Sequence, residues 1–495
     1  MNYAMSETVQ RLLYSPQGLY IEGRWLSGSS DKPLKVLNPS TGLQLCEFMP
    51  GNAADVDRAV ASARAAFEDG RWRLKPPAEK SRILLRVAEL IDAHNDELAE
   101  LEMLDAGKLH ESARKAEVPF AAECFRYHAG WCTKLEGSSK QMSLAPQGDF
   151  HVYTMHEPIG VVGLIVPYNG PLVQASWKLA PALAAGCCCV IKPDQKTPLS
   201  TLRLAELLSA AGIPAGVVNL VTGRGTEVGA AIVRHPAITK VSFTGSTDVG
   251  KEIGRVALSD LKKVTLELGG KSPVIILRDA RLEQAIPGAA NAIFSNAGQV
   301  CVAGSRLYIE EPVYDEVIEG VIQYAAALRV GPAHDPETQM GPLISEAHLN
   351  SVLRAVKSGI DQGAKLAAGG QRLDAGGGFF MTPTVLVDVD QSMGVVRDEI
   401  FGPVLVANKA SDMLQCLEYG NDSHFGLAAS IWTENLSHAH RLAARLRAGL
   451  VWINCHGIPD MAVPFGGYKQ SGWGRENGLE GLLAYTELKS VVCKL

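Results

Sequence analysis

The chain has 495 residues, of which 46% are hydrophobic and 20% are charged, and its formal net charge is −6. This length exceeds what one hydrophobic core usually serves, so we expect at least two large domains. The composition excludes a disordered or fibrous chain, and the absence of a Lys/Arg run argues against nucleic acid or an anionic membrane surface as a partner. We therefore expect small-molecule chemistry, with no nucleic-acid partner and no membrane partner.

The ten cysteines are too dilute for a disulfide framework, and no CxxC or His-x-Cys spacing indicates a metal site. The run Cys187–Cys189 lies in an apolar stretch of strand type, where neighbouring thiols point to opposite faces and pack in a reducing compartment. The first residues lack the pattern of an export signal, and no segment approaches 18 uninterrupted apolar residues. We expect a soluble, cytoplasmic protein.

The N-terminal third predicts scaffold helices after an extended start with turns at Gly23 and Asn38. Asn52 can cap a helix over 52–69. Its apolar stripe is Val56, Ala59, Val60, Ala63 and Phe67. A longer amphipathic helix is predicted from about 78 to 104. Its buried side is Leu84, Leu85, Ala88, Ile91, Leu98 and Leu101.

From residue 159 the sequence pattern changes to short apolar runs that alternate with helical stretches. The runs span 159–166, 187–191, 217–221, 240–243 and 272–277. This alternation predicts βαβ units and a parallel sheet. A second α/β half begins near 267 and extends to about 465, with strands predicted at 306–309, 383–386, 404–407 and 451–454.

Two glycine-containing turns follow predicted strands of the first half. One holds Gly225 and Gly229, and the other holds Gly245 and Ser246. Neither is a strict GxGxxG, and each by itself is explained by an ordinary turn after a strand. As a pair, with free helix N–H groups and the Ser246 hydroxyl at the carboxyl edge of a parallel sheet, they predict a pyrophosphate site.

Cys301 lies in a segment of small residues between Val300 and Val302, downstream of Glu267 in the stretch ELGGK. In such a segment a substrate carbon can reach the sulfur, so the thiol is a candidate nucleophile with a base upstream. The structural alternative is a small buried hydrophobe, which is the commoner role of a single cysteine. The nearby carboxylate, amide and glycine turns favour the nucleophile.

The tail from Tyr485 to Leu495 alternates polar and apolar residues like an exposed strand. A terminal strand of this kind invites pairing with another subunit.

Seven motifs in order resemble the NAD(P)-dependent aldehyde dehydrogenases, in pattern most closely the bacterial phenylacetaldehyde-type enzymes. They are PYNGPL at 167–172, KPDQKTP at 192–198, FTGST at 243–247, ELGGKSP at 267–273, the Cys301 segment, EIFGP at 399–403 and PFGGYK at 464–469. The resemblance implies two Rossmann-type α/β domains plus a small β oligomerisation element. The implied boundaries are 1–139 and 159–266 for an NAD(P)-binding domain, 267–479 for a catalytic domain, and 140–158 with 480–495 for oligomerisation, in a homodimer or homotetramer.

The resemblance also implies catalytic roles. Cys301 thiolate adds to the aldehyde, and the oxyanion is held by the Asn169 amide and the Cys301 backbone N–H. Glu267 matches the general base that activates water for thioester hydrolysis. Lys178 and Glu476 match a proton-relay pair, although a structural ion pair explains them equally well.

For the cofactor, the resemblance implies NAD, with NADP possible. The implied binding residues are Ile165, Val166, Pro167, Tyr168, Lys192, Gln195, Gly225, Gly229, Phe243, Thr244, Gly245, Ser246, Val249, Glu267, Leu268, Gly269, Glu399 and Phe401. Gln195 departs from the glutamate of the NAD-preferring pattern. A carboxylate there repels a 2′-phosphate and glutamine does not, so we expect NAD use with tolerance of NADP.

The substrate residues predict a roomy apolar tunnel. Relatives commonly have an aromatic residue where this chain has Gly170, and tryptophan where it has Tyr168. The apolar wall is assigned to Val173, Trp177, Val300, Val302, Ile458 and Phe465, with Gln174 and His456 as polar contacts. No Arg or Lys in these stretches forms an obvious carboxylate clamp. We expect a bulky hydrophobic or aromatic aldehyde.

Three alternatives remain. A semialdehyde dehydrogenase differs only in substrate. A CoA-acylating dehydrogenase resolves the thioester with a thiol and typically lacks the base at the Glu267 position. A catalytically silent binding or structural member of the fold is the alternative from another class, and the presence of nucleophile, base and amide argues against it.

Overall fold

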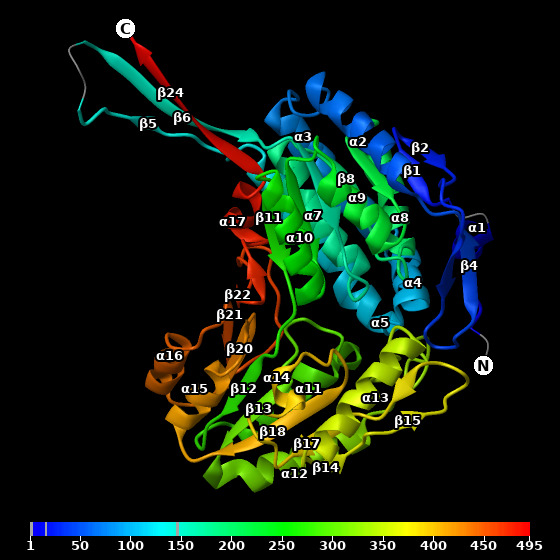
Figure 1. The fold of residues 1–495 in the computed structure, drawn as a ribbon, viewed down its shortest axis with the longest axis vertical. Coiled ribbons are helices and arrows are strands. Elements are labelled where there is room, and N and C mark those ends of the chain that lie inside the picture. The colour runs from blue at the N-terminus through cyan, green and yellow to red at the C-terminus, as the bar shows by residue number, and fades with distance from the viewer. Residues whose placement is uncertain (1–2, 15–16, 145–147) are drawn as a thin grey trace.

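Two large β-sheets with packed helices and one projecting three-stranded sheet make up the fold (Figure 1). The structure is a computed structural model that describes residues 3–14, 17–144 and 148–495. The N-terminal half builds the body with the first sheet, and residues beyond β11 (Lys263–Glu267) build most of the second body. The expected pair of α/β units with a small β element is confirmed.

The first sheet has eight strands in the order β2-β1-β9-β8-β7-β10-β11-β23. The strands are β1 (Leu19–Ile21), β2 (Arg24–Leu26), β7 (Val161–Ile165), β8 (Cys188–Lys192), β9 (Val218–Val221), β10 (Lys240–Thr244), β11 (Lys263–Glu267) and β23 (Gly472–Trp473). The five from β9 to β11 are parallel. Four of them match predicted runs, whereas β11 went unpredicted because its sequence, KVTLE, begins and ends with charge. The strand order reverses between β7 and β10, which is where open α/β sheets bind ligands.

Two helical layers flank this sheet. The layer of α2 (Ala53–Glu68), α9 (Ala230–Arg234) and α10 (Thr247–Ser259) packs together, and so does the layer of α3 (Pro77–Ala93), α6 (Val118–Trp131), α7 (Pro171–Ala185) and α8 (Leu199–Ala211). Asn52 caps α2 as predicted, since its side chain accepts from the N–H groups of Ala54 and Asp55. The single helix predicted over 78–104 is wrong. The chain breaks at His94 between α3 and α4 (Asn95–Ala106), and Leu85 is 40% exposed.

The first body also contains several shorter elements. They are α1 (Glu7–Tyr14), the antiparallel pair β3 (Leu34–Leu37) and β4 (Gln44–Phe48), α5 (His110–Ser112) and the π-helical turns Ala113–Glu117 and Gly225–Gly229.

The second sheet has seven strands in the order β14-β17-β18-β13-β12-β20-β21, all parallel except β14. They are β12 (Pro273–Ile276), β13 (Arg306–Glu310), β14 (Lys365–Ala368), β17 (Thr384–Val387), β18 (Val404–Ala410), β20 (Ala428–Trp432) and β21 (Leu450–Ile453). Its helices are α11 (Leu282–Phe294), α12 (Tyr314–Ala327), α13 (Glu346–Asp361), α14 (Gly394–Arg397), α15 (Met413–Asn421) and α16 (Leu436–Ala443). The four strands predicted after residue 300 are present, and the predicted run 272–277 forms β12 of this sheet.

Short pairs complete this half: β15 (Arg372–Leu373) with β16 (Phe380–Met381), and β19 (Phe425–Gly426) with β22 (Tyr468–Lys469). The chain then returns to the first body through β23, which pairs with β11, and α17 (Gly478–Leu483).

An arm of three strands projects from the first body (Figure 1). It contains β5 (Ser139–Lys140), β6 (Phe150–Pro158) and β24 (Thr486–Lys494), and β24 pairs antiparallel with β6 along its whole length. Residues 145–147 of the element expected at 140–158 lie outside the described residues. The C-terminal strand predicted from alternation is therefore present, and it pairs within the chain.

All ten cysteines are free, and Cys187, Cys188 and Cys189 are buried. In the described ranges no helix combines the length and apolar character needed to cross a membrane.

Candidate active site

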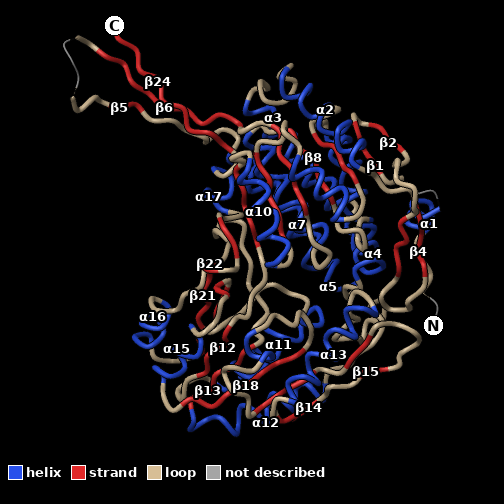
Figure 2. Tube along the Cα trace, in the orientation of Figure 1, coloured by secondary structure: helices blue, strands red, loops and turns tan. Residues whose placement is uncertain are grey.

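The parallel strands of the first sheet deliver the predicted cofactor residues to one edge. Tyr168 follows β7, Gln195 follows β8, Gly225 follows β9, Ser246 follows β10 and Glu267 ends β11. Parallel strands share one carboxyl edge, so these loops converge there. Loops gather in the region between the two sheets (Figure 2).

The start of α10 has the features of an anion site. Ser246 is exposed at the N-cap position, but its side chain makes no capping hydrogen bond, so the first N–H groups of the helix remain free. Thr244 Oγ1 is buried and has no hydrogen-bond partner in the described part of the chain. Val249 lies exposed in the first turn. The unpartnered hydroxyl and the uncapped helix start fit a phosphate-bearing cofactor.

Lys192, at the end of β8, is buried, and its Nζ donates to the Pro193 carbonyl at 2.6 Å. Burial lowers the pKa of this ammonium group. A Cβ built on Gly229 would lie 3.8 Å from the Lys192 side chain, so the predicted pair of cofactor residues is adjacent. Gln195 is half-buried in the following turn, which is closed by a 2.9 Å hydrogen bond from the Lys196 N–H to Asp194.

The thiol and the carboxylate meet because of strand register. β12 and β13 are parallel neighbours with Pro273 opposite Arg306, so the segments that precede them enter the sheet side by side. Buried Arg306 locks the two segments together by donating from Nε to the Lys271 carbonyl at 2.7 Å. A Cβ on Gly270 would come within 2.4 Å of the Cys301 carbonyl oxygen. Glycine is therefore required at 270 for this approach.

The loop before the thiol is strained and is held by side chains. Asn296 and Ala297 have left-handed φ values of 49° and 52°. Buried Gln299 donates to the carbonyls of Asn296 at 3.2 Å and Pro342 at 3.3 Å, and its Oε1 accepts from the Ile344 N–H at 2.9 Å. Strain of this kind persists only where the surroundings fix it, and it clusters at functional sites.

His456 supports the same loop from the other side. Its Nε2 lies 2.9 Å from the Val302 carbonyl and its Nδ1 lies 3.0 Å from Ser430 Oγ. Burial lowers the pKa of His456 to about 4, so the ring is neutral near pH 7. The expected polar contact of His456 with substrate is not what the geometry offers, because both ring nitrogens are already engaged. The sequence pattern could not reveal these partners.

Cys301 is partly exposed, and burial raises the pKa of its thiol to about 12, with the charges of Glu399 and Glu267 acting in the same direction. The N–H groups of Val302 and Cys301 act in the opposite direction. The thiol is consequently protonated near neutral pH until a base or a nearby positive charge favours the thiolate.

Glu267 is buried, and within the described residues neither carboxylate oxygen has a hydrogen-bond partner. Burial raises its pKa well above the ordinary value, and the charge of Glu476 adds to the effect while Lys178 opposes it. An unpartnered carboxyl group of raised pKa can take a proton from water or from a thiol.

Asn169 bridges the two sheets. Its Nδ2 donates to the Gln299 carbonyl at 2.9 Å, two residues before the thiol. A side-chain amide has two N–H groups, so a second donor remains for a ligand. The structure thus brings Asn169 beside the Cys301 loop.

Lys178 and Glu476 form a buried ion pair. Ser242 joins them, because it receives a hydrogen bond from Lys178 at 3.1 Å and donates to Glu476 at 3.0 Å. This closed network serves a relay or a structural pair equally well, so both interpretations stand. Ser242 lies in a buried strand, where no sequence signal marked it.

Glu399 packs against the ELGGK turn. Its Oε1 accepts from the Gly270 N–H at 3.0 Å, and burial raises its pKa to about 7. Phe401 has a φ of 56°, and its carbonyl lies 2.7 Å from His348 Nε2. The Tyr168 and Phe401 rings meet edge to face at 5.9 Å. A space of about 10 Å³ is bordered by Gly270, Val300, Glu399 and Phe401, among others.

Most of the predicted substrate residues lie along one face of α7 and against the thiol. Gly170 is the N-cap of α7, and Val173, Gln174 and Trp177 follow at helical spacing. A Cβ on Gly170 would meet only Gln174 within 4 Å, at 3.5 Å, so space is open there. The Trp177 and Phe465 rings are 5.2 Å apart. Val300, Cys301 and Phe465 pack on the cluster that contains Val302, whereas Ile458 is 63% exposed.

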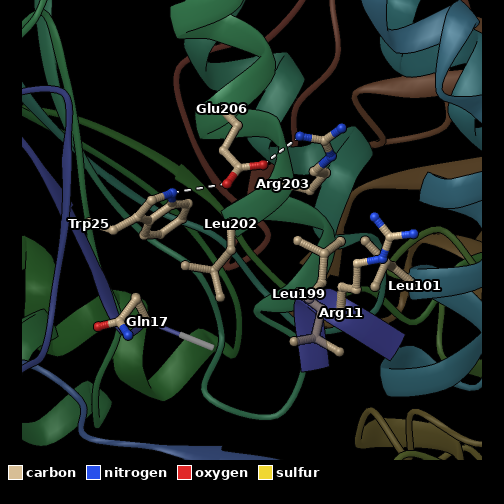
Figure 3. A pocket seen from close by; sticks show the side chains of 9 residues that line it. Arg11, Gln17, Trp25, Leu101, Leu199, Leu202, Arg203 and Glu206 are labelled. Carbon is tan, nitrogen blue, oxygen red and sulfur yellow. Dashed lines mark hydrogen bonds and ion pairs between the residues drawn. The ribbon is translucent and has the colours of Figure 1, made fainter. Parts of the chain in front are cut away.

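A separate cavity of about 170 Å³ lies between α1, β2, α4 and α8 (Figure 3). Trp25 donates to Glu206 at 2.9 Å across it, and Arg203 pairs with the same carboxylate. None of the predicted site residues lines this cavity. Within the described ranges no group of three or more His, Cys, Asp or Glu residues is arranged to hold a metal ion.

The fold is of the α/β class with a candidate thiol site at the carboxyl edge of its first sheet, and comparison with known proteins shows the family. The model of the aldehyde dehydrogenase family matches residues 25–491, so the chain belongs to that family, whose members are NAD(P)-dependent oxidoreductases acting on aldehydes. The expected enzyme class is confirmed.

Relatives of known name cover nearly the whole chain. Phenylacetaldehyde dehydrogenase of Pseudomonas fluorescens is 47% identical over 480 residues, covering 96% of each protein. Benzaldehyde dehydrogenase of Antirrhinum majus is 43% identical, covering 96% of this chain and 89% of that protein. The NAD⁺ complex of an aldehyde dehydrogenase from Bacillus cereus is 44% identical and covers 100% of both chains with a TM-score of 0.97.

Proposed function

We propose that this protein oxidises bulky hydrophobic or arylalkyl aldehydes to carboxylic acids, with NAD as the preferred hydride acceptor. The observation that carries the proposal is the convergence on one loop of a partly exposed thiol, an unpartnered buried carboxyl group and a side-chain amide: Cys301, Glu267 and Asn169. The 47% identity to phenylacetaldehyde dehydrogenase supports the substrate class.

The proposed reaction begins with transfer of the Cys301 proton to Glu267, which passes it to solvent, and with addition of the thiolate to the aldehyde carbon. The oxyanion that forms accepts hydrogen bonds from the free N–H of Asn169 and from the Cys301 backbone. Bound NAD⁺ supplies a positively charged nicotinamide and accepts the hydride that leaves the thiohemiacetal carbon. Glu267 then takes a proton from water, which attacks the thioester and releases the acid and the thiolate.

We assign the cofactor to the carboxyl edge of the first sheet. Lys192, Thr244 and Ser246 offer groups that suit ribose and phosphate, and Glu399 with Phe401 faces the thiol side. Gln195 accepts or donates a hydrogen bond but carries no charge to repel a 2′-phosphate, so NADP is tolerated. Residues 1–139 and 159–266 form the NAD(P)-binding domain in this assignment, and 267–479 form the catalytic domain.

Assembly follows from the arm. We propose that the segments 140–158 and 480–495 join copies of the chain into a homodimer or homotetramer, since among the described residues one edge of β24 is unpaired, and since β24 exposes Leu488 and Val492. The ten free thiols suit a reducing, cytoplasmic compartment.

A kinetic screen tests the function. Phenylacetaldehyde and other arylalkyl aldehydes should give the highest kcat/KM with NAD, and the product should be the free acid even with CoA present. Equal or better kcat/KM with acetaldehyde or succinate semialdehyde would contradict the substrate class. An acyl-CoA product would indicate the acylating alternative, and no reduced cofactor across the panel would indicate a silent member of the fold.

A further inference from the structure

The helices α7 and α8 begin directly after the loops that carry Asn169 and Gln195, and neither has a capping side chain of its own. The N-cap residues are Gly170 and Pro198, and neither makes a side-chain hydrogen bond to its helix. The first N–H groups of a helix have no intrahelical partner, so helix starts that are buried, as these are, need acceptors from elsewhere.

Two buried carboxylates of α4 supply those acceptors. Glu102 Oε1 accepts from the Leu172 N–H in the first turn of α7 at 3.1 Å, and it also accepts from the Ser200 hydroxyl in the first turn of α8. Asp105 Oδ2 accepts from the Leu199 N–H, the first of α8, at 2.9 Å. The two acids are three residues apart and share one face of α4. One helix therefore caps two others.

We propose that Glu102 and Asp105 are positioning residues, which cap α7 and α8 from outside and thereby fix the oxyanion amide of Asn169 and the cofactor loop at 192–198. The inference rests on the roles proposed above for those two segments. Glu102 accepts hydrogen bonds from both helices, whereas Asp105 accepts one from α8, so the losses of the two acids should differ.

The burial of these two acids indicates that they do more than fill space in the core. Glu102 and Asp105 have no exposed surface, and within the described residues Glu102 Oε2 and Asp105 Oδ1 have no hydrogen-bond partner. Burial raises the pKa of both groups, that of Glu102 to about 7. Burying unpartnered acid oxygens is unfavourable, and two converging helix N-termini offset part of that cost. Leu101, which precedes Glu102 in the sequence, and Leu199, whose N–H donates to Asp105, contribute to the apolar lining of the cavity in Figure 3.

Four variants test the proposal. Glu102→Ala should lower kcat by about 10- to 100-fold at saturating NAD and aldehyde, because the amide that holds the oxyanion shifts. Asp105→Ala should raise KM for NAD by about five- to tenfold and leave kcat within about threefold, because only α8 loses its acceptor. Glu102→Gln and Asp105→Asn keep an acceptor oxygen and should stay within about threefold of wild type in both constants.

Hydrogen exchange followed by mass spectrometry gives a readout that does not depend on turnover. Exchange should rise over 168–176 and 196–203 in Glu102→Ala but only over 196–203 in Asp105→Ala. Glu310→Ala is the matched control, since buried Glu310 also accepts a backbone N–H, from Arg278 at 2.8 Å, in the second sheet. That variant should lower Tm and leave kcat and KM within about twofold.

Several outcomes would overturn the proposal. One is that Glu102→Ala has the same kcat and the same hydrogen exchange as wild type. Another is that Glu102→Gln lowers kcat and raises exchange as much as Glu102→Ala does, because the acceptor oxygen would then not explain the effect. If Glu102→Ala does not fold, Glu102→Asp shortens the side chain by one methylene and is judged by the same measurements. If wild type oxidises no aldehyde, the proposed function fails, and the exchange pattern alone decides the capping inference.

Discussion

The two large sheets contribute to one site in different ways. The first sheet presents Tyr168, Lys192 and Glu267 at or directly after the ends of regular parallel strands. The second sheet contributes Cys301 from a loop with left-handed residues at 296 and 297, held by Gln299 and His456. Strand ends position side chains through backbone regularity, whereas the thiol loop depends on particular side-chain hydrogen bonds. Substituting a residue at a strand end should therefore impair one function of the site. Substituting a residue that holds the thiol loop should impair every function that depends on that loop.

The largest effect is expected at the thiol itself. Cys301→Ser should lower kcat by at least about a thousandfold, because a serine hydroxyl is a far weaker nucleophile at neutral pH. NAD affinity, measured by fluorescence titration, should stay within about threefold, because most of the proposed cofactor contacts come from the first sheet. A large loss of NAD affinity would show that the two regions are not separable.

Glu267→Gln comes next and tests a strand-end residue. Turnover should fall by about 100- to 10,000-fold, with a burst of one NADH per site and a covalent acyl group visible by intact mass. In wild type the raised pKa of Glu267 means that its basic form accumulates only as pH rises, so deacylation should go on speeding up at pH values where an ordinary glutamate is already fully ionised. A pH-independent wild-type rate of deacylation would contradict the assignment.

Gln299→Ala tests the loop without touching the thiol. It removes two donors and one acceptor, so the free energy of unfolding should fall by about 1 to 3 kcal/mol and kcat by about 10- to 100-fold. The rate at which an alkylating reagent modifies Cys301 should also differ from that of wild type. Gln391→Ala, which removes only the acceptor of a 3.1 Å hydrogen bond from Tyr308, is the control and should leave kcat within about twofold. An equal loss of kcat in both variants would contradict the inference that Gln299 supports catalysis by holding the thiol loop.

The smallest effect is expected at the cofactor edge. Gln195→Glu should lower kcat/KM for NADP by about tenfold and leave that for NAD within about threefold, because a carboxylate repels the 2′-phosphate. The two cofactors are compared at one aldehyde concentration. A wild-type preference for NAD of about a thousandfold or more would mean that Gln195 does not confer tolerance.

The sequence predicted the features whose pattern lies within one short, continuous segment of the chain. Apolar runs predicted four of the five central strands of the first sheet, and Asn52 predicted the start of α2. The break at His94 was missed because the apolar stripe continues across it. Gln299 lies two residues before Cys301, yet its partners at 342 and 344 are more than 40 residues away, so no spacing could assign its role.

Contiguous motifs and residue types were enough to predict the family, the two α/β units and the candidate roles of Cys301, Glu267 and Asn169. Three features required the three-dimensional structure: both ring nitrogens of His456 have protein partners, Glu267 has no partner for either oxygen among the described residues, and Glu102 and Asp105 accept from the starts of two helices. Burial and hydrogen-bond partnership are set by segments distant in the chain, and a linear pattern carries no record of them.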